Sequence, residues 1–374
     1  MRRLLAVLLA ISAAQVAAQT QPVATPAAQP VKQWPNVQGS YTIKNFKFRS
    51  GEALPELKLG YTTLGTPIRD RTGRITNAVM GLHGTGGSGR SLLNPAFSDE
   101  LFGPDAPFDL ATTYVILPDN IGHGNSSKPS DGLRMQFPHY DYDDMVEAQR
   151  RLLVEHLGVS HLKLIIGTSM GCMQAFVWGT THPGFAERLA PFACNTREIA
   201  GRNRMWRKMV VDAIKADPLW EGGNYKTQPV QGLRTANYLS ILVGGNPVAL
   251  QARYPTRELA EKALADGIAQ RGSGQDANDI IYQYESSRSY NPYPLLDRVT
   301  VPVLWINSAD DFINPPELGL AQEDVKRMPR ARFLLIPASA DTKGHGTHTW
   351  AKFWKADIVK LLGEAASYPR RQMQ

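Results

Sequence analysis

Short apolar runs alternate with polar, glycine-containing turns along most of the chain, and the apolar positions follow two different periods. Apolar residues at every second place, or in unbroken runs of about four to eight, indicate β-strands. They predict strands at residues 57–67, 77–82, 114–117, 162–166, 189–193, 301–306 and 331–337. Apolar residues spaced by about 3.6 places predict helices over residues 142–157, from residue 170 to Trp178, and over residues 350–362. Strands that alternate with helices are typical of the α/β class, with a mostly parallel central sheet and helices on both faces.

Residues 196–291 interrupt this alternation. The stretch is helix-like, carries several aromatic and basic residues, and has no obvious core strand. We therefore expect an insertion that divides one α/β core into a first part, residues 41–195, and a second part, residues 292–374.

The first 40 residues follow neither period. Residues 1–18 join a basic start, Met1-Arg2-Arg3, to an apolar run and a small-residue end at Val16-Ala17-Ala18, as cleavable export signals do. The apolar run of about 11 residues is shorter than the roughly 20 that a membrane-spanning helix needs. Residues 19–40 open with a stretch rich in Ala, Gln, Pro and Thr, which predicts a flexible lead. We expect a periplasmic or secreted protein without a membrane span in its mature chain.

Composition narrows the function classes. The chain has 374 residues, of which 43% are hydrophobic and 20% charged, which excludes a disordered, collagen-like or coiled-coil protein. Its net charge is +7, and loss of Arg2 and Arg3 with the signal lowers it to +5. The remaining basic residues are scattered among acidic ones, which is typical of a solvated surface and not of a nucleic-acid-binding stripe. We expect no nucleic-acid partner.

Ser169 occupies the centre of a G-x-S-x-G pentapeptide, Gly167-Thr168-Ser169-Met170-Gly171, between a predicted strand and a predicted helix. This setting is typical of a nucleophile elbow, a sharp turn that presents the serine at the carboxyl end of the strand. Gly167 and Gly171 keep the turn free of side chains that would clash there. We predict that Ser169 is a catalytic nucleophile.

A serine hydroxyl needs a base, and the base needs an acid that holds it in one tautomer. In α/β chains with a nucleophile elbow, the order along the sequence is serine, acid, histidine, and the acid and the histidine follow strand ends. Asp310 and Asp311 follow the next-to-last predicted strand, and His345 follows the last one. We predict Asp311 as the acid, with Asp310 capping the turn. We predict His345 as the base because glycines on both sides free its backbone, whereas His348 caps the last helix or lines the pocket.

The negative charge that develops on the substrate carbonyl oxygen needs two backbone N–H donors. The first is expected from Met170, directly after the nucleophile, and the second from Thr85 in the glycine-rich loop after His83. That loop lacks the Gly-Lys-Ser/Thr ending of a phosphate-binding loop and the spacing of a dinucleotide fingerprint. The eight histidines form no H-E-x-x-H pair, so a zinc centre is not expected. The sequence predicts no cofactor and no metal.

The chain has only two cysteines, Cys172 and Cys194, which are too few for a fold held together by several disulfides. Cys172 lies just past Ser169 and Cys194 just past a predicted strand, within reach of the expected active-site rim. Export permits a disulfide, but a sequence gives no distance between two sulfur atoms. Two separate buried thiols are the favoured interpretation.

Several stretches match one family beyond these general motifs. They are residues 60–66 (GYTTLGT), 144–149 (DMVEAQ), 167–175 (GTSMGCMQA) and 213–220 (AIKADPLW), Gly223, Tyr225, Gly232-Leu233, Asp311 with Pro315-Pro316, and Gly344-His345. With these residues the chain resembles the α/β-hydrolase superfamily, and within it the homoserine O-acetyltransferase family, over most of its length from Leu57. The resemblance implies a triad of Ser169, Asp311 and His345, an acyl-serine intermediate, and a helical lid over residues 196–291.

Departures from the family bear on function. The family usually has a glycine where Cys172 stands and an acid where Gly346 stands. The loop at residues 83–87 is closer to esterase-type loops than to the family's own. The family's acyltransferases use acetyl-CoA in the cytoplasm, where an exported chain would not meet it. We therefore expect hydrolysis of a carboxylic ester of a small molecule.

What attacks the acyl-enzyme decides between two enzyme classes. Water gives an ester hydrolase, and an alcohol or amine gives an O-acyltransferase of the homoserine O-acetyltransferase type, supplied by an acyl-CoA or another donor. A non-catalytic binding protein on the same fold is the third alternative. The partner is a small-molecule ester or acyl substrate in either enzymatic case, and the oligomeric state stays open, a dimer included.

Overall fold

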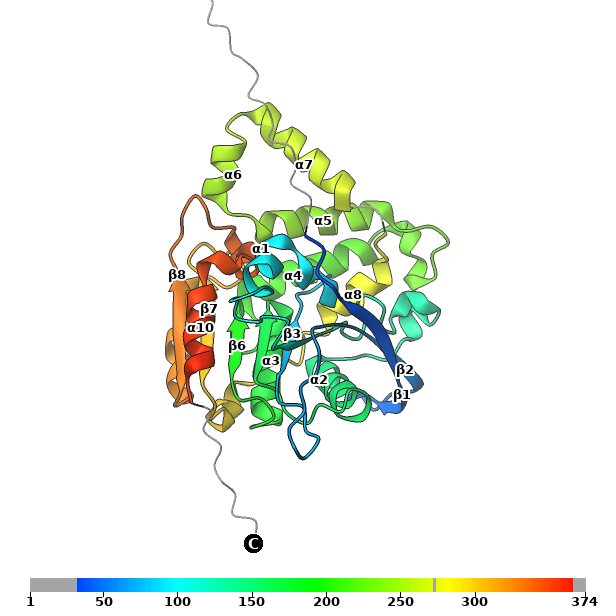
Figure 1. The fold of residues 1–374 in the computed structure, drawn as a ribbon. Helices are drawn as coiled ribbons and strands as arrows, with labels where there is room; N and C mark the ends of the chain where they lie inside the picture. Colours follow the sequence, from blue (N-terminus) through cyan, green and yellow to red (C-terminus); the bar gives the residue numbers. More distant parts are fainter. Residues whose placement is uncertain (1–31, 272–273, 366–374) are drawn as a thin grey trace, which may run out of the picture. The chain divides into compact units, whose positions relative to one another are not determined.

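The computed structural model describes residues 32–271 and 274–365, which contain a sheet of eight strands in the order β1-β2-β4-β3-β5-β6-β7-β8. The strands are β1 (Val37–Lys47), β2 (Ala53–Leu64), β3 (Ala78–Leu82), β4 (Tyr114–Pro118), β5 (Leu164–Thr168), β6 (Leu189–Phe192), β7 (Val303–Ser308) and β8 (Ala331–Ile336). β1 pairs with β2 and β2 with β4 in antiparallel fashion, and the other neighbouring pairs are parallel. The sheet is therefore mostly parallel, and only β2, the second strand from one edge, runs against the others (Figure 1).

The start of β1 corrects the predicted flexible lead. The last four residues of the segment 19–40 belong to β1, where Val37 pairs with Thr63 and Ser40 with Gly60 of β2. This strand was missed because polar residues fill most of it and only Ile43 and Phe46 are buried. The predicted export signal and the earlier part of the lead lie outside the described residues.

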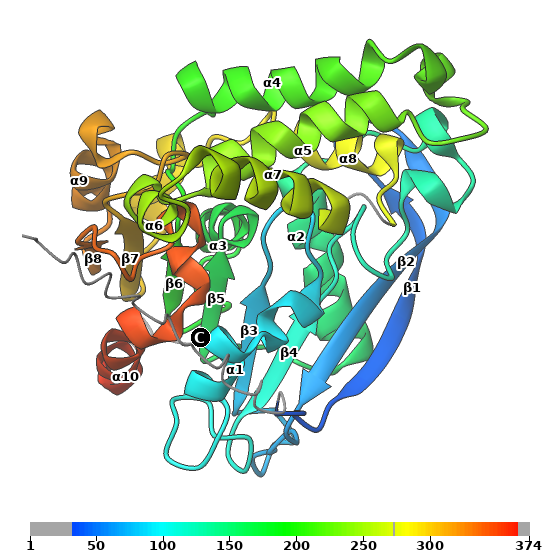
Figure 2. The ribbon, with the colours of Figure 1, turned by 90° about the horizontal axis from the view of Figure 1, so that it is seen from above.

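Helices cover both faces of the sheet, as predicted for the α/β class. Met80 of β3 belongs to one apolar cluster together with residues of α2 (Tyr142–Arg151) and α3 (Met170–Thr181). The adjacent Val79 belongs to a second cluster together with residues of α1 (Pro95–Leu101) and α10 (Lys355–Gly363). Because successive side chains of a strand point to opposite faces, α2 and α3 lie on one face and α1 and α10 on the other (Figure 2).

Two predicted helices have different bounds in the structure. The helix predicted over residues 142–157 is α2, continued by a π-helical turn at Leu152–His156. The helix predicted over residues 350–362 becomes α-helical only at Lys355, after a 3₁₀ turn at Ala351–Phe353. A short helix α9 (Leu320–Asp324) follows β7. Within the described ranges, no helix has both the length and the apolar character that crossing a membrane requires.

Residues 196–291, which we call the lid, contain five α-helices and, among their described residues, no strand. They are α4 (Gly201–Lys215), α5 (Val230–Gly244), α6 (Pro247–Arg253), α7 (Arg257–Arg271) and α8 (Ala277–Glu285). Residues of α4, α5 and α8, among them Val210, Leu233 and Ile281, form an apolar cluster of their own. α6 and α7 bury no residue, and they project at the top of Figure 1. The lid therefore has a small core of its own, separate from the two clusters on the sheet.

Candidate active site

Ser169 lies at the turn from β5 into α3, in the parallel part of the sheet. Its backbone angles, φ 55° and ψ −110°, fall in a region that non-glycine residues rarely occupy. A Cβ on Gly167 would lie 2.0 Å from the Gly171 carbonyl oxygen, and a Cβ on Gly171 would lie 2.2 Å from the Leu82 carbonyl oxygen. A side chain at either position would force the turn apart, so the sharp presentation of Ser169 requires both glycines.

Ser169, His345 and Asp311 come together from the segments that follow β5, β8 and β7. The Ser169 Oγ lies 2.8 Å from the His345 Nε2, and the His345 Nδ1 lies 2.9 Å from the Asp311 Oδ2. An ionised carboxylate accepts hydrogen bonds and does not donate them, so the proton of the neutral ring sits on Nδ1. The Nε2 atom is then free to accept the serine proton, which is the arrangement that general-base catalysis needs.

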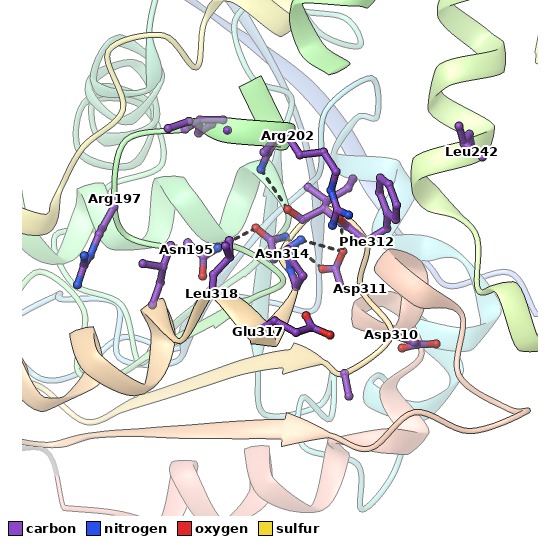
Figure 3. A pocket seen from close by; sticks show the side chains of 18 of the residues that line it. Asn195, Arg197, Arg202, Leu242, Asp310, Asp311, Phe312, Asn314, Glu317 and Leu318 are labelled. Atoms are coloured by element: carbon purple, nitrogen blue, oxygen red, sulfur yellow. Dashed lines mark hydrogen bonds between the residues drawn. The ribbon is translucent and has the colours of Figure 1, made fainter. Parts of the chain in front are cut away.

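The loop that carries Asp311 holds its carboxylate at several points. The N–H groups of Ile313 and Asn314 donate to Oδ1 at 2.8 and 3.2 Å, and the Asn314 Nδ2 donates to Oδ2 at 3.1 Å (Figure 3). Burial alone would raise the pKa of Asp311, but the neighbouring His345 and the hydrogen bonds from His345 and Asn314 outweigh burial and hold this pKa below its usual value. Asp311 is therefore ionised at neutral pH. Asn314 was not predicted, because an amide three places after an acid is no signal in a sequence.

Asp310 and His348, the candidates that the sequence disfavoured, support the loop that carries His345. The Asp310 Oδ2 accepts hydrogen bonds from the Thr342 Oγ1 at 2.8 Å and from the Gly344 N–H at 3.0 Å. The His348 Nδ1 donates to the His345 carbonyl oxygen. Burial, together with the charge of His345, lowers the pKa of His348 to about 3, so this ring is neutral at neutral pH. Neither side chain occupies the relay between serine and acid.

Two backbone segments run beside Ser169. A Cβ on Gly84 would lie 3.3 Å from the Ser169 Cβ, so the loop after β3 passes directly against the serine. Thr85, the next residue, lines the same cavity as Ser169. Met170 is the first residue of α3, and the first N–H groups of a helix have no carbonyl partner within that helix. The N–H groups of Thr85 and Met170 thus belong to the two segments that flank the serine.

A cavity of about 600 Å³ lies over Ser169, between core loops and the lid. From the core, the loops around Thr85, His123 and His345 line it. The lid contributes both apolar and polar side chains from α4, α5 and α8. The apolar ones are Trp206, Val210, Ala236, Val243 and Ile280, and the polar ones are Arg207, Asn237, Ser240, Asp279, Gln283 and Tyr284. A ligand that reaches Ser169 is therefore bounded by the reactive groups of the core on one side and by the lid on the other.

A second cavity of about 920 Å³ borders the Asp311 loop (Figure 3). Leu242 of α5 lines it together with Phe312 and Leu318, and the guanidinium carbon of Arg202 lies 3.6 Å from the centre of the Phe312 ring. Ile313 lines both cavities. This cavity contacts the acid of the relay, whereas the smaller one contacts the serine and the histidine.

Cys172 and Cys194 form a disulfide, so the prediction of two separate thiols was wrong. Thr168 at the end of β5 pairs with Phe192 of β6, which brings the first turn of α3 next to the residues that follow β6. The two Cα atoms are 5.9 Å apart, a separation that a disulfide spans. The sequence could not reveal this proximity, because it depends on β5 and β6 being neighbours in the sheet.

The two fully buried histidines, His83 and His123, both form hydrogen bonds with protein groups. The His83 ring contacts the Gly84 carbonyl oxygen and Asn120, and the His123 Nδ1 contacts the Ile121 carbonyl oxygen. In the ranges 32–271 and 274–365, no three His, Cys, Asp or Glu side chains are grouped so that they could hold a metal ion.

Comparison with known families agrees with this geometry. The profile of the alpha/beta hydrolase fold family matches residues 77–341. The chain therefore belongs to the alpha/beta hydrolase fold family, a family of enzymes. A probable acyltransferase of Methanothermobacter thermautotrophicus is 29% identical over 86% of this chain and 97% of its own. A homoserine O-acetyltransferase of Chlorobaculum parvum is 32% identical over 78% of this chain and 85% of its own.

Solved structures with the same fold include proteins named as acyltransferases and proteins named as esterases. A homoserine O-acetyltransferase from Bacillus anthracis superposes with a TM-score of 0.78 at 21% identity, covering 90% of this chain and 100% of its own. The esterase E22 superposes with a TM-score of 0.77 at 20% identity, covering 88% of this chain and 100% of its own. The two similarities are nearly equal, so they establish the fold and leave the choice between hydrolysis and acyl transfer to the site.

Proposed function

We propose that this protein is a serine ester hydrolase that cleaves a carboxylic ester of a small molecule through an acyl-serine intermediate. One observation carries the proposal. The His345 ring lies 2.8 Å from the Ser169 Oγ through Nε2 and 2.9 Å from the buried Asp311 carboxylate through Nδ1. This arrangement activates a serine hydroxyl for attack on an acyl carbonyl.

In the first half-reaction, His345 Nε2 takes the Ser169 proton while Oγ bonds to the ester carbonyl carbon. The carbonyl oxygen becomes an oxyanion, which the N–H groups of Met170 and Thr85 stabilise. The C–O bond to the alcohol then breaks, and His345 gives its proton to the departing alkoxide. In the second half-reaction, His345 takes a proton from water, the hydroxide attacks the acyl-serine, and Ser169 recovers its proton as the carboxylic acid leaves.

Water is proposed as the acceptor because we also propose that the protein works outside the cytoplasm. The composition of residues 1–18 supports export. The Cys172–Cys194 disulfide supports it independently, because disulfides persist in oxidising compartments and are rare in the cytosol. In such a compartment water is abundant and acyl-CoA is not.

Acyl transfer to an alcohol or amine is the second candidate. The sequence relatives favour it, since the two relatives described above carry the names probable acyltransferase and homoserine O-acetyltransferase. The two candidates share the acylation step and differ only in what resolves the acyl-serine. They therefore make opposite predictions about the need for an acceptor other than water.

The test measures turnover of p-nitrophenyl esters from acetate to octanoate by purified protein in the absence of CoA, with Ser169→Ala as the inactive control. A parallel assay supplies acetyl-CoA with and without homoserine and follows the free thiol that CoA release produces. We expect steady ester turnover without CoA and no homoserine-dependent thiol release. Thiol release that depends strictly on homoserine, with a single turnover of the esters, would replace hydrolysis by acyl transfer.

A further inference from the structure

His83, directly after β3, belongs to a network of buried hydrogen bonds. Its Nδ1 lies 2.8 Å from the Gly84 carbonyl oxygen, and because a carbonyl oxygen only accepts, Nδ1 carries a proton. Burial lowers the pKa of His83 to about 4, so the ring is neutral and its Nε2 is an acceptor. This Nε2 accepts from the backbone N–H of Asn120 at 3.2 Å and from the Asn120 Nδ2 at 3.0 Å.

Gln149 of α2 belongs to the same network, and its contacts settle which groups donate and which accept. Its Oε1 accepts from the Trp178 indole N–H at 2.7 Å, and an indole N–H only donates. The Gln149 Nε2 therefore faces the two other partners, the Asn120 Oδ1 and, at 2.8 Å, the Gln174 Oε1. All five side chains are at most 1% exposed, so no partner in the network can be exchanged for water.

The network of hydrogen bonds leads to the peptide unit that contains the Thr85 N–H. The Gly84 carbonyl group and the Thr85 N–H belong to one trans peptide, in which the two groups point in opposite directions. The Gly84 carbonyl oxygen accepts from the His83 ring and, at 3.1 Å, from the Gly87 N–H. Holding the carbonyl from one side therefore fixes the direction of the Thr85 N–H on the other.

We infer that Gln149 and Asn120 are positioning residues for catalysis, which orient the Thr85 N–H toward the oxyanion through His83 and the Gly84 carbonyl. The inference rests on the proposed function, because it needs an oxyanion to form at Ser169. Neither Gln149 nor Asn120 lines the cavity over Ser169, so both act only through His83. Losing an oxyanion donor outright lowers kcat by about 10²- to 10³-fold, and a misdirected donor loses part of that.

The test compares Gln149→Met with Gln174→Met. Both replace a fully buried amide by an unbranched apolar side chain of similar length, and both break the bond between Gln149 and Gln174. Gln149→Met also breaks the link to Asn120 and the bond from the Trp178 indole N–H, and only the first of these leads to His83. Each variant is assayed for kcat and KM on a p-nitrophenyl ester, for urea unfolding, and for the affinity of a trifluoromethyl ketone, which forms an oxyanion on the nucleophilic serine.

We expect Gln149→Met to lower kcat by about 10- to 100-fold with little change in KM, and to weaken trifluoromethyl ketone binding by a similar factor. Gln174→Met breaks fewer hydrogen bonds, so it is expected to lose less stability and to keep kcat and inhibitor affinity within about threefold of wild type. If Gln149→Met does not fold, the isosteric pair Gln149→Glu and Gln174→Glu replaces it, and the same contrast is expected, because an ionised carboxylate cannot donate to Asn120.

Equal losses of kcat in the two variants, or a loss of kcat without weaker inhibitor binding, would reduce Gln149 to a structural residue and overturn the inference. A failure of the proposed function looks different. In that case the wild-type protein itself neither turns over esters nor binds the trifluoromethyl ketone, and the inference falls with it.

Discussion

The α/β core and the lid contribute to the site in different ways. In the core, the Asp311 side chain is only 2% exposed, and its carboxylate accepts hydrogen bonds from both His345 and Asn314. Large apolar side chains of the lid are open to solvent, among them Leu242 at 70% and Val248 at 59%. The comparison teaches that the core holds the Ser169, His345 and Asp311 side chains in a fixed geometry, whereas one wall of the cavity over Ser169 comes from a lid that leaves apolar surface uncovered.

The largest expected effect tests the core side of this comparison. Asp311→Asn should lower kcat for p-nitrophenyl esters by about 10³- to 10⁴-fold, because an amide cannot hold the proton of His345 on Nδ1. Asp310→Asn is the matched control, since it alters a neighbouring carboxylate that bonds to the loop of His345 and not to its ring. The loss of such a bond corresponds to about 10-fold or less. The reverse ranking would assign the acid to Asp310.

The next effect compares the two regions directly. Leu164→Ala in β5 removes a fully buried side chain and should lower the free energy of unfolding by about 2–5 kcal/mol. Leu242→Ala in α5 truncates a side chain that is mostly exposed and should change it by at most about 0.5 kcal/mol. Urea denaturation at one protein concentration measures both. A large loss at Leu242 would show that this face of the lid is covered in solution and would break the comparison.

The disulfide gives a smaller effect within the core. The double variant Cys172→Ala, Cys194→Ala should lose about 3 kcal/mol of unfolding free energy, as expected for a bridge that closes a loop of this length. Urea denaturation of the variant and of the oxidised wild type measures the difference. Alkylation of the denatured wild type without reductant is the control. Labelling of both cysteines in that control would show that the bridge is absent.

The smallest effect concerns pH. Burial and the nearby His83 lower the pKa of His123 to about 3, so the folded protein binds fewer protons than the unfolded chain below pH 6.5. The stability that follows from this is present above pH 6.5 and is lost as the pH falls toward 3, at up to about 1.4 kcal/mol per pH unit. As the pH falls from 6.5 to 5, the free energy of unfolding of the variant His123→Asn should therefore decrease by about 2 kcal/mol less than that of the wild type. Equal pH dependence of urea unfolding in the two proteins would contradict it.

The sequence could predict the parts of the site that follow strand ends in a fixed order. Ser169, Asp311 and His345 each follow an apolar run, and the glycines around Ser169 mark the sharp turn. These signals are local, so the mostly parallel sheet, and the three side chains that the structure brings within hydrogen-bond distance of one another, could be predicted without knowing which strands are neighbours. The alternation of strands and helices was sufficient for the fold class.

The parts that could not be predicted depend on contacts between distant segments. The Cys172–Cys194 bridge needs β5 and β6 side by side, and β1 is too polar to stand out as a strand. The sequence contains one signal for the hydrogen bonds of Gln149. This residue lies four places after Met145 on the buried face of α2, where a polar side chain needs a partner. Its partners Asn120 and Trp178 come from other segments of the chain, so this signal alone could not reveal the network.

The most direct test of the central claim is the intact mass of the protein after rapid acid quenching of its reaction with an ester. We predict a mass increase equal to the acyl group, located on the peptide that contains Ser169, absent from Ser169→Ala, and lost again in water without CoA. An adduct on another residue, or turnover by Ser169→Ala at the wild-type rate, would contradict the account.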